Sequence, residues 1–372
     1  MLAGGEYDRP RLYEEKNRPL RSPLLEEFRA DKLKRWGVRD MHNHIAEFMC
    51  DQVGSRYIQE SILEHPTSED CDLIFNEVHH LTLQLATDVF ANFCIQKLLE
   101  KASTEQIAVM AENLKGNVLR LSLQTYGCRV IQKALEVVSP EHQVMILREL
   151  EGAVQKCVRD QNANHVIQKI ITTCPPDLLQ FVVDAFHGNI YTFATHPYSC
   201  RVLQRILENC PERMTRPLLE ELKSYALNLM QDQYGNYVIQ FCLEKGLPHD
   251  KSDIIVQIQG QVLHFSKHKF ASNVIEKCIM NATEHEINMI AAEVLAPGLD
   301  GTTGIQAMLR HEYANYPLQR LIAHTTGTLH MAIVDQVGIQ LAIFREMSPP
   351  FNAKHLVAGK LREKPLHLAT IL

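Results

Sequence analysis

The feature that most constrains this chain is an internal repeat. Seven similar segments, followed by an eighth nearer the C-terminus, read VGSRYIQ, FANFCIQ, YGCRVIQ, NANHVIQ, YSCRVLQ, YGNYVIQ, FASNVIE and YANYPLQ. Their third residues are Ser55, Asn92, Cys128, Asn164, Cys200, Asn236, Ser272 and Asn315, separated by 37, 36, 36, 36, 36, 36 and 43 residues. A period this steady predicts a solenoid, in which each unit buries its apolar face against its neighbours.

The residues between the segments predict helices. Apolar residues recur there at three- and four-residue steps, as in HQVMILRELEGAV, and no strand-like alternation occurs, which is the pattern of amphipathic helices. Glycines end these stretches at matching repeat positions, and prolines fall in the connections, as expected for helix stops. We therefore expect an all-α solenoid with two main helices in each repeat and room for a short third.

The two ends of the array differ from its middle. Residues 1–20 are polar and contain two prolines, so we expect them to be disordered and the repeat domain to span residues 21–372. Residues 22–40 read as a partial leading unit. Near the C-terminus, FNAKHLVAG keeps the motif register but has Ala358 where the other units have Gln or Glu. We expect degenerate capping units at both ends.

Composition restricts the class of protein less than the repeat does. The 44 acidic and 38 basic residues give a net charge of −6, which at face value argues against a nucleic-acid partner. No apolar stretch is long enough to span a bilayer, and the N-terminus lacks a secretory signal pattern. The ten cysteines contain no C-x-x-C pair, which favours reduced thiols over a zinc site. We expect a cytoplasmic protein without metal or cofactor.

Each position of the motif has its own chemistry. With the aligned residue as position one, positions three and four are mostly apolar and are expected in the core, while position one is small and polar. Position two is a planar or long side chain: Arg56, Phe93, Arg129, His165, Arg201, Tyr237, Asn273 and Tyr316. Position five is Gln59, Gln96, Gln132, Gln168, Gln204, Gln240, Glu276 and Gln319. On a helix, positions one and five share a face and position two lies beside them.

This combination suits single-stranded RNA. Planar side chains stack on unpaired bases, and paired polar groups can read the edge of a base. A purely structural ladder of buried amides would favour one residue type, whereas position two varies among Tyr, Arg and His. The windows of ten residues around the eight motifs carry ten Lys or Arg and seven Asp or Glu. The acidity therefore belongs to the rest of the chain.

The segments YGCRVIQKALE, NANHVIQK, YGNYVIQ and KHKFASNVIEKC resemble the repeats of the Pumilio (PUF) family of RNA-binding proteins. The resemblance implies a crescent-shaped, right-handed α-solenoid of eight three-helix repeats of about 36 residues, with RNA on the concave face. It also implies that positions one and five bind the Watson–Crick edge of one base per repeat, that position two stacks, and that the 5′ end of the RNA meets the last repeat.

The resemblance assigns a base to each repeat. Asn with Gln resembles the uracil pair, Ser or Cys with Gln the adenine pair, and Ser272 with Glu276 the guanine pair. The last assignment agrees with chemistry, because guanine offers adjacent N–H donors and an ionised Glu only accepts. Since tolerance is common in the family where a residue such as His165 occurs, the implied target is UGUA(U/N)AUA, a type of element found in messenger RNA 3′ untranslated regions. The resemblance further implies a monomer that represses translation by recruiting co-repressors and a deadenylase complex.

Three features depart from the family pattern. Pro317 stands at position three of the eighth motif, and because proline fits only the first turn of a helix, we expect this helix to start late or be distorted. Phe93 lacks the usual tyrosine hydroxyl but keeps a stacking plane. The insertion LAPGLDGTTG, residues 295–304, predicts a mobile loop. The resemblance implies a docking place for protein cofactors there, and a tolerated insertion without function is the alternative.

Other functional classes find less support. The glycines from Gly298 to Gly304 match neither a dinucleotide-binding motif nor a P-loop, and no His-Glu-x-x-His occurs. Cys128 beside Arg129 has the setting of an activated thiolate, but Cys200 beside Arg201 repeats it, and a catalytic nucleophile is not expected in several repeats. The chain is therefore not expected to be an enzyme. The alternatives are a protein-binding solenoid like the armadillo or HEAT arrays and a ribosome-biogenesis factor that binds nucleic acid without base specificity.

Overall fold

The computed structural model describes residues 21–347 except 32, 299 and 300. The predicted disorder of residues 1–20 and the predicted terminal unit at 351–359 lie outside this described part. Within it the chain is helical, with one isolated β-bridge and no strand, which confirms the all-α prediction. No helix of the described residues is long and apolar enough to cross a membrane. The chain divides into two compact units, residues 1–149 and 150–372.

Unit 1 contains a leading segment and three repeats of three helices. The leading segment consists of α1 (Pro23–Ala30) and the 3₁₀ turn η2 (Val38–Met41). The repeats are α2 (Ile45–Cys50), α3 (Gln52–Tyr57) with the π-helical η3 (Ile58–Ile62), and α4 (Ser68–Val78) with η4 (His79–Leu81); α5 (Thr82–Leu85), α6 (Ala91–Lys101) and α7 (Thr104–Leu114); and α8 (Val118–Ser122), α9 (Gly127–Val137) and α10 (Pro140–Leu150).

Unit 2 contains five further repeats of the same kind. They follow the short turn η5 (Glu151–Ala153) and comprise α11 (Val154–Arg159), α12 (Ala163–Thr173), η6 (Pro176–Leu178) and α13 (Gln180–Asp184); α14 (Ile190–Ala194), α15 (Ser199–Asn209) and α16 (Glu212–Ser224); α17 (Ala226–Gln231), α18 (Gly235–Lys245) and α19 (Pro248–Gln257); α20 (Val262–Ser266), α21 (Ala271–Asn281) and α22 (Glu284–Leu295); and α23 (Gly304–Leu309), α24 (Asn315–His324) and α25 (Gly327–Met347). The short third helix is thus present in every repeat.

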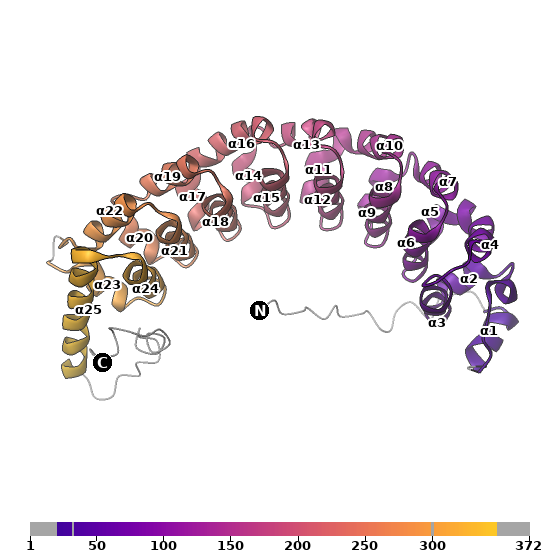
Figure 1. The fold of residues 1–372 in the computed structure, drawn as a ribbon, viewed down its shortest axis with the longest axis horizontal. Coiled ribbons are helices and arrows are strands. Elements are labelled where there is room, and N and C mark those ends of the chain that lie inside the picture. The colour runs from indigo at the N-terminus through magenta and orange to yellow at the C-terminus, as the bar shows by residue number, and fades with distance from the viewer. Residues whose placement is uncertain (1–20, 32, 299–300, 348–372) are drawn as a thin grey trace. The chain divides into compact units, whose positions relative to one another are not determined.

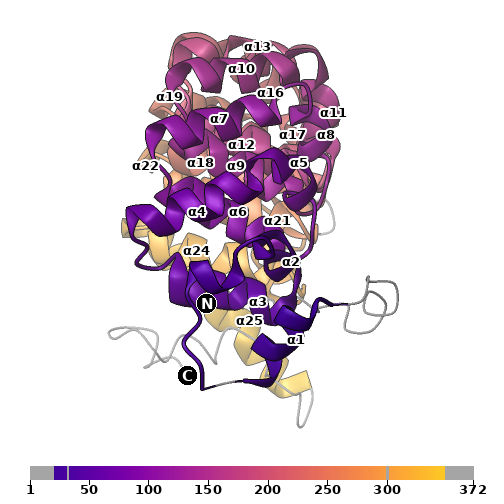
Figure 2. The ribbon, with the colours of Figure 1, turned by 90° about the vertical axis from the view of Figure 1, so that its right-hand side faces the viewer.

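Within each unit, the middle helices of successive repeats pack side by side. In unit 1, α6 packs on α9, and in unit 2 the series α12, α15, α18, α21 and α24 packs in chain order. Figure 1 shows these middle helices as a row along one side of each unit, with the third helices along the other side. Figure 2 shows the same layering in unit 1, where α5 and α8 lie apart from α4 and α7. All eight motifs lie on middle helices.

Positions three and four of the motifs form the core, as predicted. Val130 and Ile131 on α9 and Val238 and Ile239 on α18 have no exposed surface, and their counterparts in neighbouring repeats are equally buried. Burying one such aliphatic side chain contributes about 1.5–3 kcal/mol. Because these residues alternate along the helix with positions one, two and five, their burial determines the direction in which the polar positions point.

The leading segment covers the open end of the first repeat. Phe28 on α1 contacts the rings of Trp36, Phe48 and Tyr57. Asp51, which is buried at the start of α3, accepts hydrogen bonds from Arg29 at 2.7 and 3.0 Å. A repeat without a neighbour would leave its apolar face in water. The leading segment covers that face of the first repeat, which is the role expected of a partial leading unit.

Every second repeat carries a carboxylate that caps its own first helix. Glu221 on α16 accepts hydrogen bonds from the backbone N–H groups of Gly188, at 2.9 Å, and Ile190, at 3.1 Å, at the start of α14. Gly188 has φ +69°, a conformation that glycine adopts without a Cβ penalty. Glu77, Glu149 and Glu293 cap α2, α8 and α20 in the same way. The scaffold therefore has a period of two repeats, which is superimposed on the 36-residue period.

The eighth motif helix starts late, as its proline predicted. The helix α24 begins at Asn315, which is position one, whereas α21 begins one residue before its position one, at Ala271. Pro317 is then the third residue of α24 and is buried. The N–H groups of a first turn have no partner within the helix, so the proline costs no hydrogen bond there.

The insertion before the eighth repeat forms a turn with a closed base. Pro297 and Thr303 make an antiparallel bridge, and the Gly298 N–H donates to the Thr302 carbonyl at 2.7 Å. Gly301, at φ +76°, donates its N–H to the Gly298 carbonyl at 2.9 Å. Leu299 and Asp300 lie outside the described residues, and the mobility of this loop stays a prediction.

The carboxylate caps predict a measurable contribution to stability. In Glu221→Gln, the new amide offers one acceptor and one donor to two backbone N–H groups, so one of them loses its partner. We expect the free energy of unfolding to fall by about 1–2 kcal/mol in urea titrations, and the Ile190 amide to exchange faster with solvent. Glu208→Gln is the control, because its exposed ion pair with Arg205 is worth less than about 1 kcal/mol. Equal destabilisation by the two substitutions would contradict the capping role.

Candidate nucleic-acid interface

The motif side chains differ in solvent exposure in the same order on each middle helix, and we call positions one, five and two together the graded set. Position one is buried in all eight repeats, with at most 7% of its surface exposed, and position five is half-buried. Position two is exposed throughout; the fractions are 43% for Phe93, 59% for Tyr237 and 47% for Tyr316. The sequence interpretation, which set positions one and five together on one surface, is therefore corrected in one respect: position one lies at the floor, beneath position five.

In the four repeats with Asn at position one, two amides are joined. The Asn236 Nδ2 group donates to the Asp232 carbonyl at 2.8 Å, and its Oδ1 accepts from Gln240 Nε2 at 2.9 Å. The pairs Asn92–Gln96, Asn164–Gln168 and Asn315–Gln319 repeat this contact at 3.0, 2.9 and 3.1 Å. One N–H of the Gln amide is engaged by the Asn Oδ1, and the Gln carbonyl oxygen, for which no bond is described, can accept from a ligand.

In the other four repeats, a smaller side chain occupies the floor. Ser272 and Cys200 each donate to a backbone carbonyl three residues earlier, at 3.3 and 3.6 Å. Gln59 Nε2 donates to Ser55 Oγ at 2.9 Å, and Gln132 Nε2 donates to the Cys128 carbonyl at 3.0 Å. Because Ser and Cys are shorter than Asn, they leave more depth above them. The alternation of Asn with Ser or Cys therefore alternates the depth of the sites.

Glu276 is chemically distinct from the seven glutamines at position five. Its side chain is 20% exposed, and its Oε2 accepts a hydrogen bond from Arg320 Nε of the next repeat at 3.0 Å. A carboxylate accepts only, whereas an amide both donates and accepts. This site can therefore satisfy a ligand edge with two adjacent N–H donors, and it disfavours a ligand edge that presents an acceptor.

The position-two residues are not equivalent. Tyr237, Tyr316 and Phe93 present exposed aromatic planes, while Arg56 is held by Glu60 on its own helix at 2.8 Å. Asn273 turns back, with its Nδ2 group 3.4 Å from the Phe270 carbonyl. The exposed aromatic members have planes on which a base could stack, and their stacking stays a prediction. For Asn273, no exposed aromatic plane supports that prediction.

Sequence reasoning missed the residues that form the turn before most motif helices; the third repeat, with Gln124 at this position, is the exception. Asp232, four residues before position one, accepts from the N–H groups of Tyr234 and Gly235 at 2.8 and 2.7 Å, and Asp88 and Asp160 do the same. In other repeats a histidine Nδ1 replaces the carboxylate. His268 accepts from Phe270 and Ala271 at 3.2 and 3.3 Å, and His196 and His311 act alike. The recurrence of Asp or His at this one position was the signal.

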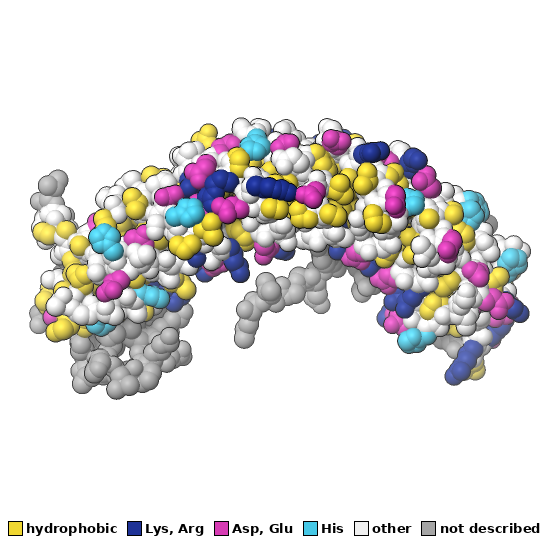
Figure 3. Space-filling view, turned by 45° about the horizontal axis from the view of Figure 1, so that its top comes forward, with side chains coloured by type: hydrophobic (Ala, Val, Ile, Leu, Met, Phe, Trp, Pro, Cys, Tyr) yellow, Lys and Arg dark blue, Asp and Glu magenta, His cyan; other side chains and the backbone are white. Residues whose placement is uncertain are grey.

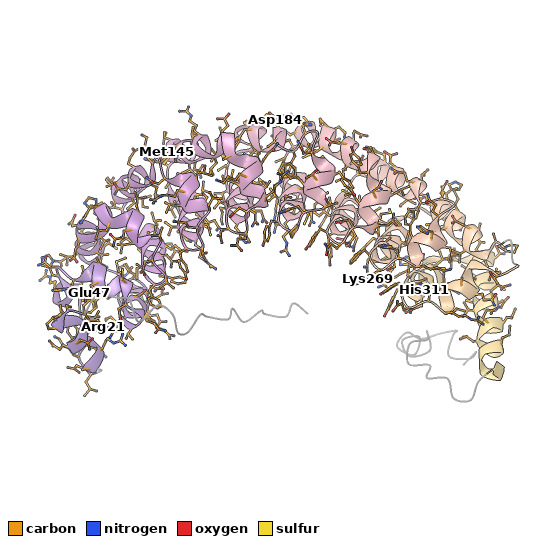
Figure 4. All side chains as sticks on the ribbon, turned by 180° about the vertical axis from the view of Figure 1, so that it is seen from behind. Arg21, Glu47, Met145, Asp184, Lys269 and His311 are labelled. Atoms are coloured by element: carbon orange, nitrogen blue, oxygen red, sulfur yellow. The ribbon has the colours of Figure 1, made fainter. Side chains whose placement is uncertain are left out.

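These turns lie on the same side as the motif helices. In Figure 4, Lys269 in the turn before α21 and Asp184 at the end of α13 lie on opposite sides of unit 2. In the four repeats with Asn at position one, the carbonyl of the turn residue also holds the Asn amide, as Asp232 holds Asn236. The turn therefore fixes both the start of the helix and the orientation of its first polar side chain.

Two of the histidine turns depend on a neutral ring. Burial, followed by the charge of Arg159, lowers the pKa of His196 below its ordinary 6.5. Burial, followed by His264, lowers the pKa of His268 in the same way. Since Nδ1 accepts in both turns, protonation removes the acceptor. Folding disfavours protonation of these two rings. The stability contributed by the hydrogen bonds to Nδ1 is therefore complete above pH 6.5 and is lost as the pH falls through the lowered pKa of each histidine.

Burial disfavours the thiolate form of several cysteines. Burial raises the pKa of Cys200, which outweighs the opposing influence of Arg201, so a thiolate is disfavoured there. Burial raises the pKa of Cys94 and of Cys242 to about 12. In the described part of the chain, no three His, Cys, Asp or Glu side chains gather in a way that could hold a metal ion.

A family model matches seven stretches of the chain. It is described as the Pumilio-family RNA binding repeat, and the matched residues are 44–79, 82–114, 117–151, 154–187, 189–223, 225–259 and 261–295. These stretches coincide with the first seven three-helix repeats. The eighth repeat, α23 to α25, follows the last matched stretch and has the same helix order.

Curated relatives match over a short part of their length. A stretch of 72 residues is 46% identical to the maternal protein pumilio of Drosophila melanogaster and covers 19% of this chain and 5% of that protein. A stretch of 75 residues is 46% identical to Pumilio homolog 1 of Xenopus laevis, with 20% and 6% covered.

Solved structures match over most of the chain. The Puf3 RNA binding domain bound to Cox17 RNA 3′ UTR recognition sequence site B is 36% identical, with a TM-score of 0.80, and the match covers 94% of this chain and 98% of that one. PUF-8 in complex with PBE-RNA is 31% identical, with a TM-score of 0.81, and 87% and 95% are covered.

The histidine turns predict a local response to pH. Between pH 7.5 and 5.5, we expect the Phe270 and Ala271 amides to lose protection from hydrogen exchange, after correction for the intrinsic rate, because His268 becomes protonated and no longer accepts. The Tyr234 and Gly235 amides, held by Asp232, serve as the internal control and should keep their protection. In His268→Asn, which retains a short acceptor without a titratable ring, the acid response should disappear. Uniform loss across both kinds of turn would contradict this assignment.

Proposed function

Because the chain belongs to the Pumilio family of RNA-binding repeat proteins, we propose that it recognises single-stranded RNA of the type UGUA(U/N)AUA in messenger RNA 3′ untranslated regions. The observation that carries this proposal is the graded set of positions one, two and five, which recurs in all eight repeats. A row of exposed planes with polar groups between them matches unpaired bases, which offer both a face and an edge.

Each kind of repeat fits one kind of base edge. Where Asn236 and Gln240 are joined, the free Gln carbonyl accepts from a single N–H donor, which is what uracil offers between its two carbonyls. Glu276 accepts from the adjacent N–H donors of guanine. The deeper sites above Ser55, Cys128 and Cys200 leave room for adenine, which is larger than uracil.

The order of bases follows from the order of repeats. We propose that the 5′ uracil lies at Asn315 and Gln319 with Tyr316 stacking, guanine at Ser272 and Glu276, and the 3′ adenine at Ser55 and Gln59. The intervening assignments are the pairs Asn236 with Gln240 for uracil, Cys200 with Gln204 for adenine, Asn164 with Gln168 for the tolerant fifth base, Cys128 with Gln132 for adenine, and Asn92 with Gln96 for uracil.

The distribution of charge favours edge reading over phosphate clamping. Figure 3 shows basic and acidic side chains interspersed on the side of each unit opposite the motif helices. Many are paired: Arg216 contacts the buried Asp250 at 2.6 Å, and Lys223 contacts Asp253 at 2.7 Å. The windows of ten residues around the eight motifs are only mildly basic, with ten Lys or Arg and seven Asp or Glu, so we expect affinity to come mainly from stacking and base edges, with a shallow dependence on salt.

We propose a regulatory role that follows from RNA binding. A protein that holds a 3′ untranslated region and carries out no chemistry acts by bringing other proteins to the messenger. Co-repressors and a deadenylase complex are the proposed partners, with translational repression and messenger decay in the cytoplasm as the outcome. The protein itself is proposed to bind as a monomer, since one chain supplies all eight sites.

The UGU element predicts a large difference in affinity. The dissociation constants for UGUAUAUA and for ACAAUAUA should differ by at least about a hundredfold, because three base edges are mismatched at about 1–3 kcal/mol each. Fluorescence anisotropy with labelled 8-mers measures this directly. Changing only the fifth base should alter the affinity much less. Equal binding of the UGU and ACA oligonucleotides would contradict base-specific recognition and favour a protein-binding or non-specific solenoid.

The register of repeats and bases can be tested by exchange of side chains. Ser272→Asn combined with Glu276→Gln converts the seventh site to the pattern of the sixth, and we expect its preferred base to change from guanine to uracil. Cys200→Asn is the matched variant in a second repeat and should change the preference at the fourth base from adenine to uracil. Competition among four RNAs that differ at one base gives the readout. A guanine preference that survives the double substitution would show that the register or the orientation is wrong.

A further inference from the structure

Ion pairs link successive middle helices at one fixed place. Position six, the residue after the base-edge residue, is often a cation, and in several repeats it contacts a Glu of the preceding repeat. Lys133 on α9 contacts Glu100 on α6 at 2.6 Å, whereas Lys97 contacts Glu64, in the turn after η3, at 2.9 Å. In unit 2, Lys277 on α21 contacts Glu244 on α18. Glu100 and Glu244 both stand at position nine of their repeats.

This series changes between the seventh and the eighth repeat. Position nine of the seventh repeat is Met280, which is 42% exposed and offers no carboxylate. The position-six cation of the eighth repeat, Arg320, therefore lacks its usual partner. It contacts Glu276, four residues earlier on α21, where its Nε–H donates to Oε2 at 3.0 Å. Position five thus receives the cation that position nine receives in the pairs Lys133–Glu100 and Lys277–Glu244.

We infer that Arg320 is a positioning residue that sets the base preference of the seventh site through Glu276. The inference rests on the proposed function, in which Glu276 reads guanine. A carboxylate can accept about four hydrogen bonds, so the bond from Arg320 to Oε2 leaves Oε1 and the remaining lone pairs for two N–H donors. The guanidinium is planar and permanently charged, and its bond to Oε2 restricts the rotation of the carboxylate about the last side-chain bond.

Orientation matters here because Glu276 lacks the support from position one that holds the Gln side chains of the Asn repeats. The Gln side chains of the Asn repeats are held from below by the position-one amide, as Gln240 is held by Asn236. In the seventh repeat, the Ser272 hydroxyl donates its proton to the Lys269 carbonyl. It therefore has no proton left for the Glu276 carboxylate, and no bond between Ser272 and Glu276 is described. Arg320 supplies from the next helix the support that Asn supplies from the floor.

The proposed role predicts a selective loss. The Arg320 side chain is 48% exposed and that of Glu276 20%, so the pair is only partly shielded from solvent. We expect Arg320→Met to lower the affinity ratio of UGUAUAUA over UAUAUAUA about two- to fivefold, in line with the value of partly exposed ion pairs. Binding to the adenine RNA should change less, because adenine offers one amino donor beside the N1 acceptor and cannot use two oriented carboxylate oxygens as guanine does.

Met280→Glu tests the same idea without removing Arg320. The new carboxylate restores the acceptor at position nine, in the arrangement seen for Glu244 and Lys277. We expect it to draw Arg320 away from Glu276 and to reduce the guanine ratio in the same direction. Arg205→Met is the matched control, because Arg205 also stands at position six, is 49% exposed, and contacts only Glu208 among the described ion pairs, at 2.7 Å on its own helix. It should leave the guanine ratio unchanged.

The outcomes separate this inference from the function on which it rests. If the unsubstituted protein shows no preference for guanine at the second base, the proposed function is wrong. If it prefers guanine and Arg320→Met keeps the ratio, the positioning role is overturned alone. Equal weakening toward both RNAs, with a salt dependence reduced by about one counterion, would show a phosphate contact in its place and would also overturn it. A gain in guanine affinity would overturn it too, because Arg320 would then be competing for the carboxylate.

Discussion

The burial of positions three and four is the constraint on which the rest of the structure depends. Val130, Ile131, Val238 and Ile239 have no exposed surface, so each middle helix has one rotation about its axis at which its apolar face is covered. That rotation places position one at the floor, position five above it and position two in solvent. The apolar positions therefore set the direction of the polar ones, and the eight sites can differ in chemistry while the scaffold stays the same.

The fold and most site positions could be predicted because they depend on spacing along one helix. The 36-residue period, the position of the core and the late start at Pro317 all follow from local rules, and the structure agrees with each. The burial of position one was not predictable in the same way. Asn164 and Asn236 are polar, and only the packing of neighbouring repeats shows that their amides are covered and held by backbone carbonyls.

The contacts that escaped sequence reasoning join residues on different helices. Glu221 and Gly188 are 33 residues apart, and Arg320 and Glu276 are 44 apart across the insertion. The partner of Arg320 also depends on a residue that offers no carboxylate: Met280 stands at position nine, where several other repeats have Glu, so Arg320 contacts Glu276. The turn residues Asp232 and His268 are an intermediate case. They recur at one position of the repeat, but a polar residue in any single turn does not by itself predict a hydrogen bond to the backbone.

The scaffold and the readout share a period of two repeats. The carboxylate caps at Glu77, Glu149, Glu221 and Glu293 belong to the repeats with Ser or Cys at position one, and the repeats between them carry Asn. Under the proposed function, the small floor residue faces a purine and the larger Asn faces a pyrimidine, so the depth of each site compensates for the size of its base. A binding surface built this way keeps the RNA backbone at an even distance from the helices, which allows one stacking residue per repeat to serve every base.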